Sequence, residues 1–554
     1  MDIRSSNPLL ETWSGAFGVP PFGRIKPEHF RPAFDRAIAE HESEIETIAA
    51  GAEEPSFDNT IAALERSGRP LGRVSDVFHA LAGAHTNEAL QAIEREMSPR
   101  LAAHRNRLYL NERLFGRVAG LFARRDSLGL SPEQARVLDR YHTAFRRAGA
   151  HLDAGTKERL QQITERLAGL GTSFSQNVLA DEQDYALVLE REDDLVGLPE
   201  SVREAARNAA AERGLPGKYA ITLSRSSVEP FLQFAAKRDL REKICRAWAA
   251  RGDNGGKTDN NAIIAEMVAL RAERAKLVGF ASFAHYRLDD SMAKTPQAVR
   301  ALLDRVWPLA RARAHADRDA MQALIQTEGG NFKLAPWDWR FYAEKLRKAR
   351  HDLDEATIKP YLQLEKMIEA AFDTARRLFG LSFAPLDDAP VWHPDVRVWE
   401  VRGADGSHVG LFFGDYFARA SKHSGAWMTT LRDQEKLAGD IRPLVVNVMN
   451  FAKAAGKAPS LLSFDDARTL FHEFGHALHA LLSDVTYALI SGTSVLTDFV
   501  ELPSQLYEHW LERPEVLQRF AIHAETGAPM PAEILGRLLA ARTFNQGFAT
   551  VEYV

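Results

Sequence analysis

The sequence has almost no cysteine, no excess of charge of one sign and no long apolar run. Among its 554 residues only Cys245 carries a thiol, which rules out a disulfide within the chain and fits a reducing compartment. Lysine and arginine number 70, against 75 aspartate and glutamate residues, so the composition argues against nucleic acid as a partner. No apolar stretch approaches the roughly 20 residues of a membrane span. We therefore expect no contact with membranes.

Two further absences narrow the function. The first residues, MDIRSSNPLLETWSG, contain no apolar core of the kind a signal peptide needs, which predicts a soluble, cytoplasmic protein. The chain also contains no Gly-x-Ser-x-Gly segment. Together with the single cysteine, this argues against a serine or cysteine nucleophile and an acyl-enzyme route.

The first half of the chain has the apolar spacing of amphipathic helices. Residues 26–50 place apolar side chains at intervals of about 3.6. Residues 57–68 predict a helix with a cap near Asp58 and a stop at Gly68. Two short segments, 185–190 and 219–224, favour strands with a helix between them. We expect an N-terminal helical domain over 1–230 and a catalytic domain over 231–554.

The pattern changes between about residues 385 and 455. Residues 396–403 alternate apolar and polar side chains, Ala-Asp-Gly turns the chain, and residues 407–417 follow as the second half of a hairpin. Residues 443–451 can supply a third strand. We expect a small antiparallel sheet directly before a helix that contains two histidines. An extended peptide can bind to such a sheet by adding a strand to its edge.

The segment TLFHEFGHALHALL contains the motif His-Glu-x-x-His. On a helix, His472 and His476 lie one turn apart and point the same way, so that both imidazoles can reach one ion. Glu473 lies about 100° round the helix, where it can act as a general base. Roughly 0.04 chance matches are expected in a chain of this length and composition. Two histidines on an ordinary helix face therefore remain the alternative.

A catalytic zinc site needs a third protein ligand. In one class of zinc peptidase this is a histidine six residues after the second, but Leu482 occupies that position here. In another class it is a glutamate from a second helix, and Glu501 follows a Gly/Ser/Thr-rich loop. Glu508 or Gln505, which share a helix face with Glu501, could orient a ligand.

Capping signals place the starts of the two helices. Ser463 can accept hydrogen bonds from the first turn of the histidine helix, and Asp465 and Asp466 suit its positive end. Thr497 or Asp498 can cap the helix with Glu501. A further histidine, His479, follows the motif by three residues; it either packs in the core or contacts a ligand or the substrate.

Together these segments resemble the thimet oligopeptidase family of zinc metallopeptidases. FHEFGHALH and SGTSVLTDFVELPSQLYEHW carry the resemblance, and APWDWRFYAEKLR and GLFFGDYFARASKHSGAWM favour its bacterial peptidyl-dipeptidase branch. The resemblance implies a mainly α-helical ellipsoid with a deep central channel, in which one Zn²⁺ per chain is held by His472, His476 and Glu501. It implies hydrolysis of short unfolded peptides, with release of C-terminal dipeptides by attack of a zinc-bound water and Glu473 as base. We also expect a monomer.

Family members continue beyond the equivalent of Val554, with a segment rich in glycine and tyrosine. After Glu501 this sequence contains only Tyr507 and Tyr553 as tyrosines, so we expect a form lacking its C-terminal segment. Three alternatives stay open. The chain could be an endo-acting oligopeptidase of the same family, a catalytically impaired protein that binds zinc and peptide, or a helical scaffold with an accidental motif.

Overall fold

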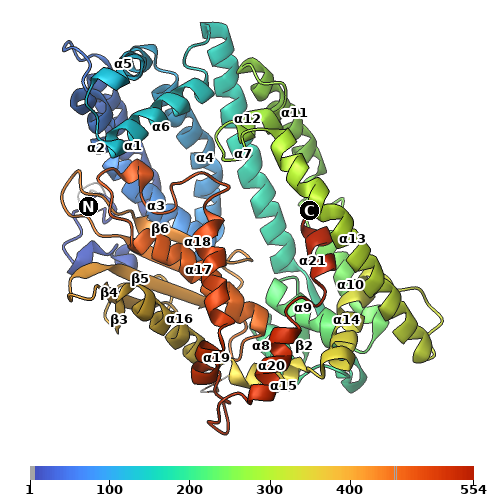
Figure 1. Cartoon of the computed structure of the whole chain (residues 1–554). Helices are drawn as coiled ribbons and strands as arrows, with labels where there is room; N and C mark the ends of the chain where they lie inside the picture. Colours follow the sequence, from blue (N-terminus) through green and yellow to red (C-terminus); the bar gives the residue numbers. More distant parts are fainter. Residues whose placement is uncertain (1–6, 455, 457) are drawn as a thin grey trace.

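Helices make up most of the molecule. A computed structural model describes residues 7–454, 456 and 458–554 (Figure 1). Within these residues no helix is both long and apolar enough to cross a membrane. The helices are α1 (Pro27–Ala49), α2 (Ala63–Arg66), α3 (Arg69–Ala84), α4 (Glu88–Tyr109), α5 (Glu112–Ala123), α6 (Pro132–Ala148), α7 (Ala154–Asp184), α8 (Glu200–Glu212), α9 (Arg225–Phe234), α10 (Arg238–Ala249), α11 (Asn261–Leu277), α12 (Phe283–Leu288), α13 (Pro296–Thr327), α14 (Pro336–His351), α15 (Glu355–Ile358), α16 (Leu364–Phe379), α17 (Phe464–Leu481), α18 (Glu501–Leu511), α19 (Pro514–Phe520), α20 (Ala532–Ala540) and α21 (Gln546–Tyr553).

The predicted helix over residues 26–50 is confirmed as α1. The next predicted start is wrong by two residues, because Ser56 rather than Asp58 caps the following helix. The Ser56 hydroxyl accepts from the Asn59 amide, and the Asn59 side chain accepts from the Ser56 amide. Asp58 instead forms an ion pair with Arg66. The capped turn over residues 57–62 is a π-helix that continues into α2.

Both sheets contain the strands that the sequence predicts. Strands β1 (Ala186–Leu189) and β2 (Tyr219–Thr222) pair antiparallel, with α8 between them in the chain. The larger sheet has the order β3-β4-β5-β7-β6. Its strands are β3 (Ser382–Pro385), β4 (Arg397–Arg402), β5 (His408–Phe417), β6 (Trp427–Arg432) and β7 (Leu444–Phe451). The β4–β5 hairpin is confirmed.

The expected antiparallel sheet is confirmed for three of its four strand pairs, and the pair of β5 with β7 departs from it. After β5 the chain crosses over to form β6 and then returns as β7, which inserts between β5 and β6. Strand β7 therefore pairs parallel with β5 and antiparallel with β6. The insertion is favourable because β7 is almost wholly apolar and is buried along nearly its whole length. It leaves β6 at the edge of the sheet.

Helices cover both faces of this sheet (Figure 1). On one face Val445 and Met449 of β7 join a core with α16 and α17. On the other face Val446 and Val448 join a core with α1 and α3. The N-terminal helices therefore share a core with the sheet that supports the histidine helix, and the domain division near residue 230 stays a prediction.

Helices α17 and α18 approach each other at backbone distance. A Cβ atom added at Gly475 of α17 would lie 2.7 Å from the Ser504 Cα and 2.9 Å from the Tyr507 Cβ. Real Cβ atoms do not come so close, so only glycine permits this separation of the two helices. Tyr507 also donates to the Ala371 carbonyl at 2.7 Å, which ties α18 to α16.

Replacing Gly475 by alanine should push α17 and α18 apart. We expect Gly475→Ala to lower stability by about 1–3 kcal/mol, the usual cost of overfilling a packed core, and to weaken metal binding. The control is Gly120→Ala in α5, where an added Cβ meets no atom within 4 Å; it should be neutral or slightly stabilising. Thermal unfolding and a zinc titration measure both effects. Wild-type stability and metal affinity in Gly475→Ala would contradict the packing argument.

Candidate metal centre

The three predicted metal ligands come together. The Nε2 atoms of His472 and His476 each lie 3.2 Å from the same carboxylate oxygen, Oε2 of Glu501. One donor atom from each side chain lies within 4.8 Å of the other two. Zinc bonds of about 2.0–2.1 Å in a tetrahedron place neighbouring donors about 3.3 Å apart. The donor set therefore fits a zinc ion.

Local sequence places the two histidines on one face of α17. The helix begins as predicted, because Ser463 and Asp466 exchange reciprocal hydrogen bonds between side chain and backbone amide. Apolar residues on the opposite side of α17, including Phe471 and Phe474, are buried against the sheet and α18. The helix cannot rotate without exposing them, so the imidazoles are held toward Glu501.

Glu501 is the first residue of α18. The expectation that Thr497 or Asp498 caps this helix is wrong, since neither immediately precedes it. Asp498 instead accepts from the backbone amides of Met292 and Ala293, each at 2.8 Å, and so anchors the loop to a distant segment. The first turn of a helix leaves Glu501 half exposed and able to reach across to α17.

Two neighbours hold the ligands in place. Glu508 lies 2.7 Å from His472 Nδ1 and fixes that ring with Nε2 toward Glu501. Of the two candidates in the sequence, Glu508 is the one in contact, whereas Gln505 is exposed. Ser504 donates to Glu501 Oε2 at 2.8 Å. Ser504 is not among the residues predicted from the sequence, although its position one turn after Glu501 could have indicated it.

Two further polar side chains of α17, Glu473 and His479, differ in how deeply they are buried. Glu473 is 5% exposed, and its Oε2 has no hydrogen-bond partner among the described residues. Burial raises the pKa of Glu473 to about 7, with His472 opposing and Glu501 reinforcing the shift. His479 is half buried, and its Nδ1 has no partner in the described part of the chain. Packing in the core and contact with a ligand or substrate both stay predictions for His479.

The carboxylates also act on the histidines. Burial lowers the pKa of His472, but the hydrogen bond to Glu508 and the charges of Glu473, Glu508 and Glu501 outweigh burial, so the net shift is upward. For His476 burial prevails and the pKa is lowered. Three carboxylates around two imidazoles give the site an excess of negative charge, which a divalent cation would offset.

A cavity of about 340 Å³ lies beside the start of α17. Asp465 and Arg468, which precede His472 on α17, contribute to its wall together with Arg340 and Glu344 of α14. Half of the lining residues are charged, so the space next to this helix is suited to polar ligands such as peptide ends.

Removing the Glu508 side chain should weaken metal binding. We expect Glu508→Ala to lower zinc affinity about 10- to 100-fold, the usual effect of losing the partner of a metal-ligating histidine. Glu508→Gln should lower zinc affinity less, because its amide oxygen can still accept a hydrogen bond from His472. The matched control is Gln505→Ala, one turn earlier on α18, which should bind zinc normally. Equal affinities for Glu508→Ala and wild type in a competitive zinc titration would contradict this role.

The chain is similar to peptidases along its whole length. It is 42% identical over 551 residues to the dipeptidyl carboxypeptidase of Escherichia coli, a match that covers 99% of this chain and 81% of the relative. It is 33% identical over 548 residues to oligopeptidase A of Escherichia coli, covering 98% of this chain and 80% of the relative. A solved structure assigned to oligoendopeptidase F has a TM-score of 0.50 at 14% identity, covers 90% of this chain and 71% of that one, and supports the fold alone.

A family model spans the part of the chain that carries the metal centre. The model of peptidase family M3 matches residues 231–554, which include both histidines and Glu501. With relatives above 30% identity over nearly the full sequence, the chain belongs to peptidase family M3, a family of metallopeptidases.

Proposed function

We propose that this protein is a zinc-dependent peptidyl-dipeptidase that removes dipeptides from the C-termini of short unfolded peptides. The observation that carries the proposal is the convergence of two imidazole nitrogens on one Glu501 oxygen, each at 3.2 Å. His472, His476 and Glu501 would hold the metal. One zinc ion per chain, a monomeric state and a cytoplasmic location stay predictions from the sequence.

A zinc ion in this site would supply Lewis-acid chemistry to the scissile carbonyl and to water. Glu473 is the proton carrier of the chain itself. Because its pKa is raised to about 7 by burial, its carboxyl group can both accept and release a proton near neutral pH. Glu473 takes the proton of the attacking water and delivers it to the amine that leaves. No other described group hydrogen-bonds to its Oε2, so this oxygen is free for that role.

The edge strand β6 supports the binding of an extended peptide. It pairs with β7 on one side only, and within the described residues no strand pairs with its other edge. Helix α17 packs against β6 and β7, so this edge runs beside the metal helix. A peptide that adds to β6 as a strand would form main-chain hydrogen bonds independent of its side chains. Such binding suits an enzyme that accepts peptides of varied sequence.

The peptidyl-dipeptidase activity is inferred from the relatives with dipeptidyl carboxypeptidase in their name, which are 41–42% identical to the chain. Endo-acting hydrolysis is the alternative, since the oligopeptidase A relatives also match over nearly the whole chain at 33% identity. The two activities share the metal centre and differ in whether the substrate needs a free C-terminal carboxylate.

Replacing Glu473 by glutamine should separate metal binding from catalysis. The amide cannot accept a proton, so we expect Glu473→Gln to retain stoichiometric zinc and to lose peptide hydrolysis by about 10²–10⁴-fold. Elemental analysis and a fluorogenic peptide assay measure the two properties. Glu515→Gln, an exposed residue in the first turn of α19, is the matched control and should keep full activity. Normal turnover by Glu473→Gln would remove Glu473 from the mechanism.

Blocking the C-terminus of a substrate should distinguish the two activities. We expect a peptide with a free carboxylate to lose its C-terminal dipeptide and the same peptide with a C-terminal amide to be cleaved far more slowly. Mass spectrometry of the products identifies the scissile bond. Equal cleavage of the amide at internal bonds would establish endo-acting hydrolysis instead.

A further inference from the structure

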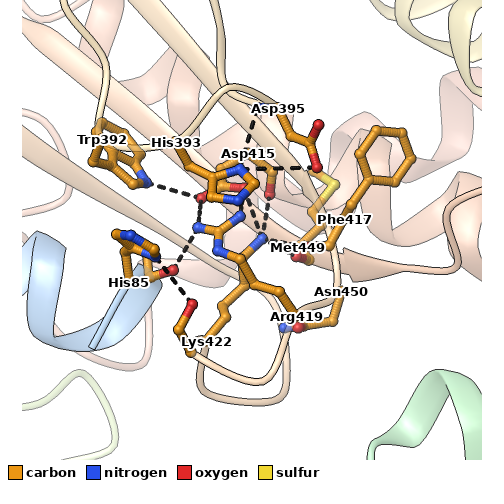
Figure 2. Close-up of polar contacts among 12 residues, drawn as sticks. His85, Trp392, His393, Asp395, Asp415, Phe417, Arg419, Lys422, Met449 and Asn450 are labelled. Atoms are coloured by element: carbon orange, nitrogen blue, oxygen red, sulfur yellow. Dashed lines mark hydrogen bonds and ion pairs between the residues drawn. The ribbon is translucent and has the colours of Figure 1, made fainter. Parts of the chain in front are cut away.

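A buried ionic cluster lies at the end of strand β5, on the side of the sheet away from the metal ligands. Asp415 is 0% exposed. Its carboxylate accepts from Trp392 Nε1 at 3.0 Å, from Arg419 Nη1 at 2.8 Å and from Lys422 Nζ at 2.8 Å (Figure 2). Every partner is charged or a strong donor, so the position of this carboxylate is fixed from several directions.

Lys422 joins the ends of two strands. Its side chain is fully buried, and besides Asp415 it donates to the carbonyls of Phe417 at 2.6 Å and Met449 at 2.8 Å (Figure 2). Phe417 ends β5 and Met449 lies near the end of β7. Burial lowers the pKa of Lys422 to about 8 against the opposing effect of Asp415, so the amine stays charged at neutral pH. Burial also acts to raise the pKa of Asp415, but Arg419 and Lys422 outweigh it and the pKa is lowered.

The same cluster attaches a loop to the N-terminal helices. Residues 418–426 connect β5 to β6, and Arg419 in this loop donates to the Ala84 carbonyl at the end of α3. The backbone amide of Thr86 donates to Ser421 at 2.7 Å, and that of His423 donates to Gly83 at 2.9 Å. The loop and residues 83–86 therefore run together as hydrogen-bonded backbone.

The final residues of the loop are held just before β6 begins. Asn450 Nδ2 donates to the carbonyls of His423 at 2.9 Å and Gly425 at 2.7 Å. Strand β6 starts at Trp427, whose ring lies so close to Gly83 that an added Cβ there would be 3.3 Å away. The path from Asp415 to β6 is thus defined by hydrogen bonds at each end of the loop.

We propose that Asp415 is a positioning residue for substrate: through Lys422 and Arg419 it fixes the loop 418–426 and thereby sets the position of the β6 edge that receives the peptide. This inference rests on the proposed function, because β6 is assigned there as the peptide-binding edge. Asp415 does not touch the metal ligands and acts only through the loop. Its loss should weaken peptide binding and leave the metal centre intact.

The test is Asp415→Asn, which keeps the shape of the side chain and removes its charge. A mispositioned edge weakens the ground state and the transition state alike, so KM should rise while kcat changes little. We expect KM for a peptide of six or more residues to rise tenfold or more, with kcat within threefold of wild type and zinc content unchanged. Arg419→Gln should shift KM in the same direction, and it tests the proposal if Asp415→Asn does not fold.

The matched control is Asp338→Asn. Asp338 of α14 is also 0% exposed and binds Arg241 at 3.0 Å and Arg238 at 2.9 Å, but it has no contact with the loop 418–426. We expect both Asp338→Asn and Asp415→Asn to lower thermal stability. Only Asp338→Asn should keep the wild-type KM. A KM for Asp415→Asn within twofold of wild type, or an equal rise in both variants, would overturn the positioning role.

Hydrogen–deuterium exchange separates this inference from the proposed function. In Asp415→Asn we expect faster exchange in residues 83–86 and 418–432, with the exchange of α17 unchanged; Asp338→Asn should leave these segments protected. This readout needs no peptidase activity, so it decides the structural claim even if the wild type cleaves no peptide and the proposed function fails. Unchanged protection of residues 427–432 in Asp415→Asn would refute the inference.

Discussion

The backbone contact between α17 and α18 at Gly475 is the constraint on which the metal centre depends. The ligands come from two helices, and a side chain at position 475 would collide with Ser504 and Tyr507. Only this close crossing lets the first residue of α18 meet a histidine pair on α17. The geometry of the candidate metal centre is therefore a property of helix packing, because the distances between its three side chains are set by Gly475, which is not one of them.

The electrostatics of the site follow from its burial. Glu473, Glu501 and Glu508 surround two imidazoles, and all three favour the protonated form of His472 and so raise its pKa. Where a carboxyl group is buried without a partner, as in Glu473, its pKa rises to about 7. Where it hydrogen-bonds to a histidine, as in Glu508, it raises the pKa of that ring. The two carboxylates thus have different environments: Glu473 on α17 is buried without a partner among the described residues, and Glu508 on α18 is hydrogen-bonded to an imidazole.

Periodicity and capping signals were sufficient to predict α1, the β4–β5 hairpin and the start of α17. The motif His-Glu-x-x-His and the need for a third ligand predicted that His472, His476 and Glu501 converge. They could not predict β6 or the parallel pairing of β7, because strand order depends on how the chain crosses over and leaves no local pattern. The cap at Ser56 was missed because two residues of similar capping strength lie close together. Asp415 binds Arg419 and Lys422, which in turn bind Ala84 and Met449, and this cluster forms only in the folded chain.

The two faces of strand β5 are held by different kinds of interaction. Phe412 and Tyr416 pack in the core with α17, a contact that depends on area and tolerates small shifts. Asp415, between them on the opposite face, is bound by directional hydrogen bonds to charged groups that would be costly to leave unpaired. Apolar packing alone would hold the metal helix against the sheet without defining where the edge strand lies. The buried charge fixes the position of the edge strand. A hydrophobic side chain at position 415 could fill the same space, but it would form none of these directional bonds.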